Sequence, residues 1–185
     1  MERNQAVSSL RATLDWLGDD VKWLAREVDP IIEATAIAKA FDDGPAFVAE
    51  HIKGYPNARY IGNLWTRRER VAKLVGVDDY RDVKHRIIHA VKNPIPPKVV
   101  DKAACQDVVI TGKEVRLSTL PIPVWTPGKD KGPYITTNTV TRDHDTGIQN
   151  MGVYRTMVRD ETSVVSNLRP GRQGYLNTLT WTDKG

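Results

Sequence analysis

The stretch GPYITTNTVTRDHDTGIQNMGVYRTMVRD, from Gly132 to Asp160, decides the predicted fold of the second half of this chain. Two segments rich in β-branched residues flank the polar loop at 143–147, where Gly147 can adopt positive φ. The pattern therefore predicts a β-hairpin. Its second strand carries three polar or charged side chains, Asn150, Tyr154 and Arg155. Polar side chains are unexpected on a short strand that should otherwise pack against a core. Contact with a bound ligand would explain their presence.

Upstream of the hairpin, helical and strand patterns alternate, which favours a small α/β unit over residues 1–92. We expect helices near 9–17, 31–41, 67–75 and 80–91, and strands near 21–28, 47–52 and 58–65. Ser8 or Ser9 and Gly18 are the predicted caps of the first helix, and Thr66 is the predicted N-cap of the third. No residue of this unit has the setting of a catalytic group. His85 and His89, spaced i, i+4, lack a supporting third ligand and are expected to be solvated.

A proline-rich linker at 93–104 follows, because three prolines in four residues enforce an extended backbone without pairing. Beyond it, the apolar runs at 107–110 and 115–117 flank a turn and predict another hairpin. The alternating prolines at 120–125 are incompatible with a central helix. Residues 105–185 therefore form a second, largely β domain with little helix until its end.

Composition limits the classes of function. The net charge of +4 comes from Lys and Arg that are interleaved with Asp and Glu, so the chain lacks a nucleic-acid-binding tract. Scattered arginines suit a small ligand that carries phosphate. No apolar run is long enough for a membrane span, and the N-terminus is too polar for a signal peptide. The single cysteine, Cys105, excludes an internal disulfide, is expected to be a small buried apolar residue, and fits a reducing cytoplasm.

Several motifs in order along the chain resemble one enzyme family, the UbiD-type decarboxylases and carboxylases that use prenylated flavin mononucleotide (FMN). The motifs are Leu120-Pro121-Ile122-Pro123, Gly132-Pro133-Tyr134-Ile135-Thr136, Thr141-Arg142-Asp143, Thr146-Gly147, Asn150, Tyr154-Arg155 and Met157-Val158. The resemblance covers the N-terminal α/β unit and the start of a split β-barrel that binds the cofactor, so the expected fold class is α+β. It implies reversible decarboxylation of α,β-unsaturated, aromatic or heteroaromatic acids. It also implies a divalent metal (Mn²⁺ or Mg²⁺), and often K⁺, at the cofactor phosphate.

The resemblance assigns roles residue by residue. Asn150 matches the family's metal-ligating asparagine, and a carboxamide oxygen suits a hard cation. Arg155 matches the arginine beside the flavin and the substrate carboxylate, where a guanidinium binds bidentately and tunes an acid–base glutamate. Val153 and Tyr154 match positions whose backbone lines the cofactor. Arg169 and Arg172 match the region around its phosphate.

The sequence departs from the family pattern in two ways. Gln173 stands where the family commonly has a metal-binding histidine, and glutamine can offer a carbonyl oxygen to a hard metal but cannot replace imidazole on a softer one. The family's third metal ligand and its catalytic glutamates would lie beyond Gly185. We therefore expect an incomplete enzyme: a truncated piece, or one subunit that depends on another chain.

Two other functions remain open from the sequence: a non-catalytic subunit that binds cofactor or a partner, and a plain FMN binder of split-barrel type. The expected partners are a small carboxylic acid, a flavin prenyltransferase that supplies the cofactor, and a complementary subunit or further copies of the chain. Neither nucleic acid nor a membrane is expected as a partner.

The spacing of the two main candidates gives a geometric test. Asn150 and Arg155 are five residues apart, so on a regular strand their side chains point to opposite faces. If both contact one ligand, the strand must be irregular between them, and we expect that irregularity near Gly152. A regular strand would instead make Asn150 a locally bonded residue and Arg155 a solvated one.

Overall fold

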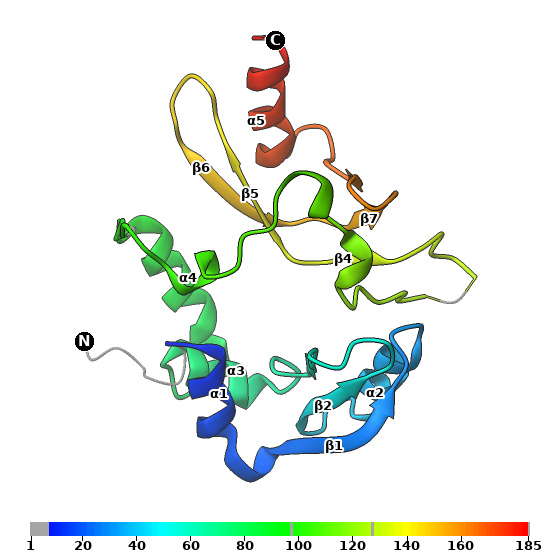
Figure 1. Cartoon of the computed structure of the whole chain (residues 1–185). Coiled ribbons are helices and arrows are strands. Elements are labelled where there is room, and N and C mark those ends of the chain that lie inside the picture. The colour runs from blue at the N-terminus through cyan, green and yellow to red at the C-terminus, as the bar shows by residue number, and fades with distance from the viewer. Residues whose placement is uncertain (1–7, 97, 127, 185) are drawn as a thin grey trace. The chain divides into compact units, whose positions relative to one another are not determined.

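The structure is a computed structural model that describes residues 8–96, 98–126 and 128–184. The chain divides into two compact units. The first contains the described residues up to Asp29 together with Glu33–Ile110, and the second contains Pro30–Ile32 together with the described residues from Thr111 onward. As expected, the first unit is mixed α/β, and the second consists of short strands followed by an α-helix at its end (Figure 1).

The first unit follows the predicted alternation of elements. Its helices are α1 (Leu10–Leu17), α2 (Glu33–Ala40), α3 (Arg68–Val75) and α4 (Val83–Lys92), and its strands are β1 (Val21–Val28), β2 (Ala46–Ile52) and β3 (Tyr60–Gly62). The short 3₁₀ turns η2 (Gly18–Asp20), η3 (Tyr80–Asp82) and η4 (Ala104–Gln106) complete it. The sheet order is β1-β2-β3, with β1 parallel and β3 antiparallel to β2. Because α2 lies between the two parallel strands in sequence, it provides the crossover that parallel pairing requires.

The predicted caps are correct for α1 and wrong for α3. Ser9 Oγ accepts a hydrogen bond from the Ala12 N–H at 3.1 Å, and Gly18 ends α1 at φ 51°. At α3 the N-cap is Arg67, without a capping side-chain bond. Thr66 Oγ1 instead donates to the Asn63 carbonyl at 3.1 Å, so its hydroxyl serves the preceding turn.

The central strand β2 forms the core of the first unit. Its residues Ala46–Ala49 are all buried, and they pack with β1 and α2. The Phe47 ring lies over Gly62, where an added Cβ would come within 2.3 Å of it. A partly buried ion pair adds a polar contact, because Arg70, 4% exposed, binds Asp20, whose side chain is 34% exposed.

The second unit contains two small antiparallel sheets and one helix. Its strands are β4 (Tyr134–Ile135), β5 (Asn138–Arg142), β6 (Gln149–Val153), β7 (Thr156–Val158) and β8 (Val164–Ser166), followed by α5 (Gln173–Thr182). Two 3₁₀ turns, η5 (Gly112–Glu114) and η6 (Leu117–Thr119), precede them. Strands β4, β7 and β8 form one sheet and β5–β6 the other, and α5 packs beside β5–β6 (Figure 1). In the described part of the chain these strands do not close into a barrel.

The hairpin predicted within residues 132–160 is confirmed. Strands β5 and β6 pair regularly from Asn138↔Val153 to Arg142↔Gln149. In the connecting loop, Asp143 Oδ1 accepts hydrogen bonds from the backbone N–H groups of Asp145 (3.1 Å) and Thr146 (2.8 Å). The loop is therefore an Asx-type turn that holds the two strands in register.

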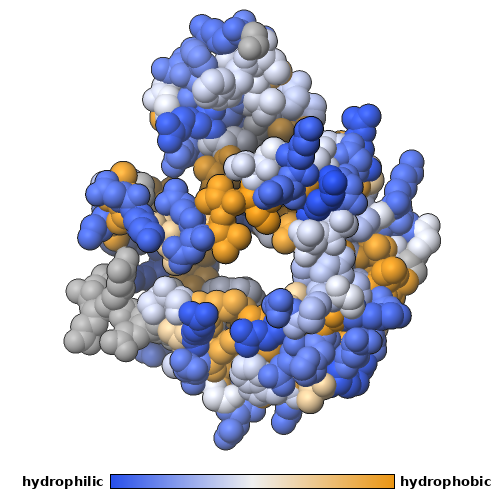
Figure 2. Space-filling view, viewed as in Figure 1, coloured by the Kyte–Doolittle hydropathy of each residue, from blue (hydrophilic) through white to orange (hydrophobic). Residues whose placement is uncertain are grey.

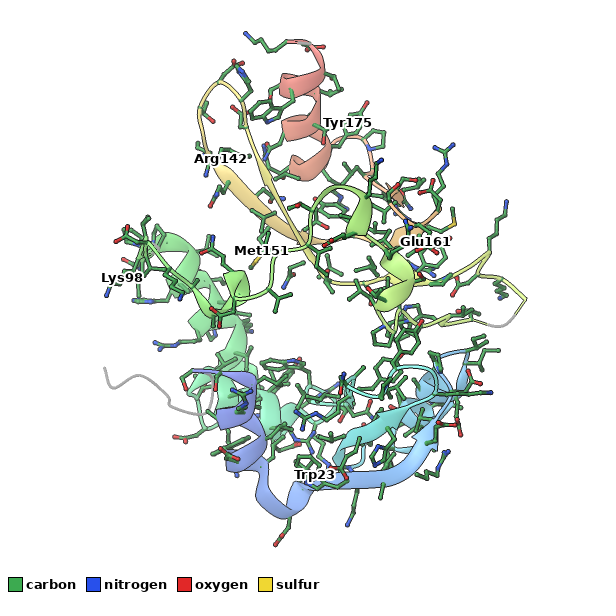
Figure 3. The ribbon with its side chains drawn as sticks, viewed as in Figure 1. Trp23, Lys98, Arg142, Met151, Glu161 and Tyr175 are labelled. Carbon is green, nitrogen blue, oxygen red and sulfur yellow. The ribbon has the colours of Figure 1, made fainter. Side chains whose placement is uncertain are left out.

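The outer face of this hairpin is exposed within the described structure and carries apolar side chains beside the polar Asn138, Arg142 and Gln149. Val140 and Met151 form a cross-strand pair there, with Met151 67% exposed, and Val153 lies beside them. Figure 3 labels Met151 on β6, and Figure 2 shows hydrophobic side chains at the surface among hydrophilic ones.

Two other expectations are wrong. The hairpin predicted at 107–117 does not form, because Gly112 at φ 59° closes the turn η5 and the Leu117 N–H donates to the Glu161 carbonyl at 2.8 Å. The η5 turn and the bond to Glu161 leave the 107–110 run unpaired and exposed. Cys105 is also exposed instead of buried.

No helix in the described ranges combines the length and apolarity needed to cross a bilayer.

Candidate functional site

One cavity of the second unit, about 460 Å³ in volume, brings the predicted site residues together. It is lined by Asn150, Gly152, Val153, Tyr154, Arg155, Asn167, Arg169, Arg172 and Gln173. All seven residues singled out in the sequence are among these nine. Asn167 was not foreseen from the sequence, because it follows β8 without any motif that marks it.

The cavity forms where the chain leaves one sheet for the other. The β5–β6 ladder is regular through Gly152 and ends at Val153, whereas Thr156 begins β7 and pairs in the second sheet. Tyr154 and Arg155 lie between these strands and belong to neither. An irregularity was therefore correctly expected, but it follows Gly152 and is a change of sheet, not a bulge. This change lets Asn150 and Arg155 line one cavity.

The glycines on either side of Tyr154 make room for its ring. A Cβ added at Gly152 would come within 3.0 Å of the ring, and one added at Gly174 would come within 2.3 Å of the hydroxyl. Tyr154 thus fills the space between β6 and the first turn of α5. Side chains at these two positions would displace it and the wall that it forms.

Arg155 is positioned by two groups that the sequence did not reveal. Its Nη2 donates to Asp130 Oδ1 at 2.6 Å, and its guanidinium carbon lies 4.5 Å from the centre of the Tyr134 ring. The Arg155 carbonyl also accepts a hydrogen bond from the Asn167 N–H at 3.1 Å. The Arg155 side chain remains 53% exposed, so N–H groups are still available to an anion in the cavity.

Asp130 is the buried member of this ion pair, with a side chain 6% exposed. Its Oδ2 accepts a hydrogen bond from the Thr126 N–H at 2.8 Å. Burial alone would raise the pKa of this carboxyl, but the hydrogen bonds from Arg155 and Thr126 and the charge of Arg155 outweigh burial and lower the pKa. Asp130 is therefore ionised at neutral pH and holds one edge of the guanidinium.

The segment before α5 supplies positive charge to the cavity. The Arg172 N–H bonds to the Arg169 carbonyl at 3.2 Å, and Gly171 at φ 78° allows the turn between them. Neither arginine forms an ion pair with a residue that the structure describes. Helix α5 begins at the next residue, so its first N–H groups add to the positive potential.

Three carboxamides, those of Asn150, Asn167 and Gln173, lie on the cavity wall. Asn150 makes no side-chain hydrogen bond with any part of the chain that the structure describes. Gln173 Nε2 donates to Asn177 Oδ1 at 2.7 Å, which leaves the Gln173 carbonyl oxygen as an acceptor. The i, i+4 spacing of Gln173 and Asn177 on a helix could have indicated this pair from the sequence.

A cluster of three or more His, Cys, Asp or Glu side chains suited to a metal does not occur among the described residues. His85 and His89 are exposed, as expected. Among the described residues, the cavity therefore offers a cation oxygen donors that include the carboxamides of its lining.

The acids near the hairpin are not poised to donate a proton. Hydrogen bonds lower the pKa of four carboxyl groups, those of Asp143, Asp145, Asp160 and Glu161. The principal partners are, in the same order, Thr146, His144, Ser163 and Ser118. All four are therefore ionised near neutral pH, whereas a general acid needs a pKa near the working pH.

Comparison with known proteins identifies the family. Residues 98–185 match the 3-octaprenyl-4-hydroxybenzoate carboxy-lyase Rift-related domain (UbiD), and residues 18–87 match the N-terminal domain of the same carboxy-lyase. The chain belongs to the UbiD family, whose members with similar structures are decarboxylases. The resemblance drawn from the motifs is thereby confirmed.

Solved structures of UbiD-class enzymes share this fold. HmfF from Pelotomaculum thermopropionicum, in complex with FMN, is 30% identical at a TM-score of 0.83, covering 91% of this chain and 38% of HmfF. An evolved dimeric form of HmfF, in complex with prenylated FMN (prFMN), is 31% identical at 0.81, covering 88% of this chain and 38% of that one.

Two further enzymes extend the comparison. The 3,4-dihydroxybenzoic acid decarboxylase of Enterobacter cloacae is 26% identical at a TM-score of 0.86, covering 97% of this chain and 40% of that chain. The vanillic acid decarboxylase ShVdcCD of Sedimentibacter hydroxybenzoicus is 27% identical at 0.70, covering 85% of this chain and 36% of that chain. This chain thus spans about two fifths of the length of the enzymes that it matches.

Proposed function

We propose that this chain supplies part of the cofactor site of an enzyme that reversibly decarboxylates an α,β-unsaturated, aromatic or heteroaromatic carboxylic acid with prenylated FMN. The observation that carries the proposal is the convergence of Asn150, Arg155 and the 169–173 segment on one cavity. These residues come from separate parts of the sequence, and the change of sheet after Val153 is what joins them.

The residues present fit the proposed cofactor. Arg169, Arg172 and the first turn of α5 would hold its phosphate, since paired guanidinium groups and helix N-termini bind phosphate oxygens. The carboxamide oxygens of Asn150 and Gln173 would hold Mn²⁺ or Mg²⁺ beside that phosphate, because hard cations prefer oxygen donors. K⁺ would suit the same oxygen-rich surroundings.

Arg155 would bind and orient the substrate carboxylate. Its guanidinium can form two parallel hydrogen bonds with a carboxylate, while Asp130 and Tyr134 limit its movement. Bound prenylated FMN would supply the electron sink for the charge left on the substrate when CO₂ departs. The change of sheet after Val153 brings Arg155 and the phosphate-binding residues to one cavity.

The proton for the product must come from another group. The four carboxyl groups near the hairpin have lowered pKa values and are ionised at neutral pH. We infer that a carboxylic acid outside these residues serves as the donor, from another segment or from a second chain.

A second candidate is a subunit of a split enzyme, in which a partner chain supplies the acids. The similarity to ShVdcCD, which includes the component ShVdcD, and the exposed apolar side chains of Val140, Met151 and Val153 favour this alternative. Further copies of this chain could cover the same face. The single cysteine still favours a reducing cytoplasm as the compartment.

Production of the chain with and without a flavin prenyltransferase tests the proposal. Native mass spectrometry and visible absorbance should detect a prenylated flavin bound only in the first case. Equal binding of unmodified FMN in both cases would support a plain FMN binder, and no flavin in either case would contradict the cofactor site. Decarboxylation of aromatic acids that requires an added second chain would support the split enzyme.

A further inference from the structure

A buried carboxamide lies behind the cavity and links α5 to the hairpin. Asn177 is 1% exposed, and both ends of its side chain are bonded. Its Nδ2 donates to Thr141 Oγ1 on β5 at 3.1 Å, and its Oδ1 accepts from Gln173 Nε2 at 2.7 Å. The chain of hydrogen bonds runs from Gln173 through Asn177 to Thr141 and is called here the amide relay.

The relay fixes which end of Gln173 is available to a ligand. A glutamine amide has a donor end and an acceptor end, and a free one can turn either toward a ligand. Here the donor end is bonded to Asn177, so the carbonyl oxygen is left for the cavity that Gln173 lines. A cation in the cavity would therefore contact the carbonyl oxygen of Gln173 and not its N–H group.

The relay also reduces the cost of binding. A glutamine side chain loses considerable rotamer freedom when a ligand immobilises it, and a bond made beforehand removes part of that loss. Metal-ligating histidines are oriented in the same way by a partner on their second nitrogen. Asn177 would orient the side-chain amide of Gln173 as such a partner orients the imidazole ring of a histidine.

We propose that Asn177 and Thr141 are positioning residues that hold the carboxamide of Gln173 with its oxygen toward the cavity, as a ligand for Mn²⁺ or Mg²⁺. This inference rests on the proposed function, because it assumes a cation beside the cofactor phosphate. It explains how a chain with glutamine at this position retains a hard-cation site without imidazole. It also explains why a fully buried polar side chain is present in a unit with little buried apolar surface.

Binding of Mn²⁺ to the full chain in the presence of FMN, followed by the electron paramagnetic resonance signal of free Mn²⁺, tests the inference. Loss of an outer-shell partner typically weakens metal binding by about 10- to 100-fold. We expect a loss in this range for Asn177→Leu, a loss at least as large for Gln173→Ala, which removes the ligand itself, and a smaller loss for Thr141→Val. Thr178→Val is the matched control, because Thr178 bonds to the Gly174 carbonyl on the same helix and lies outside the relay.

A double-mutant cycle separates positioning from structural support. If Asn177 acts through Gln173, Asn177→Leu should have no further effect on Mn²⁺ affinity once Gln173→Ala is present. An equal loss in both backgrounds would overturn the inference, as would unchanged affinity in Asn177→Leu. If Asn177→Leu does not fold, the same cycle with the isosteric Thr141→Val decides.

The direction of the amide can be tested separately. Asn177→Asp keeps an acceptor for Gln173 Nε2 and should preserve Mn²⁺ binding, whereas a loss as large as that of Asn177→Leu would show that Gln173 presents its nitrogen and would overturn the inference. A wild-type chain that binds FMN without Mn²⁺ would overturn the metal part of the proposed function together with this inference. Uncoupled effects in a chain that does bind Mn²⁺ would overturn the inference alone.

Discussion

Each of the two units of this chain is stabilised internally by a different kind of interaction. Every buried hydrophobic side chain among the described residues lies in the first unit, most of them in the two clusters that include β2. In the second unit the fully buried side chain is polar, that of Asn177, and the hairpin residues Val140 and Met151 are exposed. The first unit is therefore stabilised by apolar burial, and the second by hydrogen bonds, an ion pair and short sheets.

This difference coincides with the division of function. The candidate cofactor site lies wholly in the second unit, where polar groups must remain available to a ligand. A surface that leaves Asn150, Arg169 and Arg172 without partners in the described structure gives up contacts that would have stabilised it. The first unit has the larger buried apolar core among the described residues.

The largest expected effect is on the core of the first unit. Phe47→Ala removes a ring that is 3% exposed and should lower the free energy of unfolding by about 3–5 kcal/mol. Val140→Ala on the exposed hairpin face is the control and should change it by about 0.5 kcal/mol or less. Chemical denaturation followed by circular dichroism measures both, and similar losses would show that the two units do not differ in this way.

An intermediate effect is expected from the wall of the cavity. In Gly174→Ala the new Cβ would lie within 2.3 Å of the Tyr154 hydroxyl, so overpacking should cost about 1–3 kcal/mol despite the better helix propensity of alanine. Tyr154→Ala in the same chain should relieve the clash. A Gly174→Ala variant as stable as the wild type, by the same denaturation, would mean that Tyr154 does not fill this space.

The smallest expected effect comes from the ion pair behind Arg155. Asp130→Asn removes the charge and should lower the stability at pH 7 by less than either of the two substitutions above. The pKa of Asp130 is lowered in the folded state, so its contribution is complete above the unfolded value of about 3.9 and is lost as the pH falls through the lower folded value. Unfolding measured from pH 7 to pH 3 should show a constant difference down to about pH 5 and a shrinking one below about 3.9. A difference that grows on acidification would contradict this assignment.

The sequence predicted those parts of the fold that depend on local patterns. The alternation of the first unit, the Ser9 cap and the 138–153 hairpin follow from periodicity, capping and turn chemistry. The run at 107–110 resembles a strand but finds no partner, because the backbone that would pair with it bonds locally and to Glu161. Pairing depends on the tertiary fold, and an apolar run alone does not specify it.

The candidate site shows the same limit. Motif resemblance supplied seven of the nine lining residues, but it gave no sign of Asp130, Asn167 or Asn177. Asp130 and Asn167 contact Arg155 across 25 and 12 positions of sequence, through contacts that only the folded chain creates, whereas Asn177 contacts Gln173 across four positions of one helix. Residues that orient a ligand-binding group carry no motif of their own.

The central claim is that the cavity of the second unit binds the phosphate end of a flavin through Arg169 and Arg172. Equilibrium dialysis of FMN against the full chain, with Mn²⁺ present, tests it most directly. Arg169→Gln with Arg172→Gln should weaken FMN binding by about 10-fold or more, since each charge-assisted hydrogen bond contributes about 1.5–3 kcal/mol. Arg142→Gln with Arg159→Gln removes the same charge from exposed positions outside the cavity and should leave the affinity nearly unchanged. Equal weakening by the two pairs, or none by the first, would contradict the account.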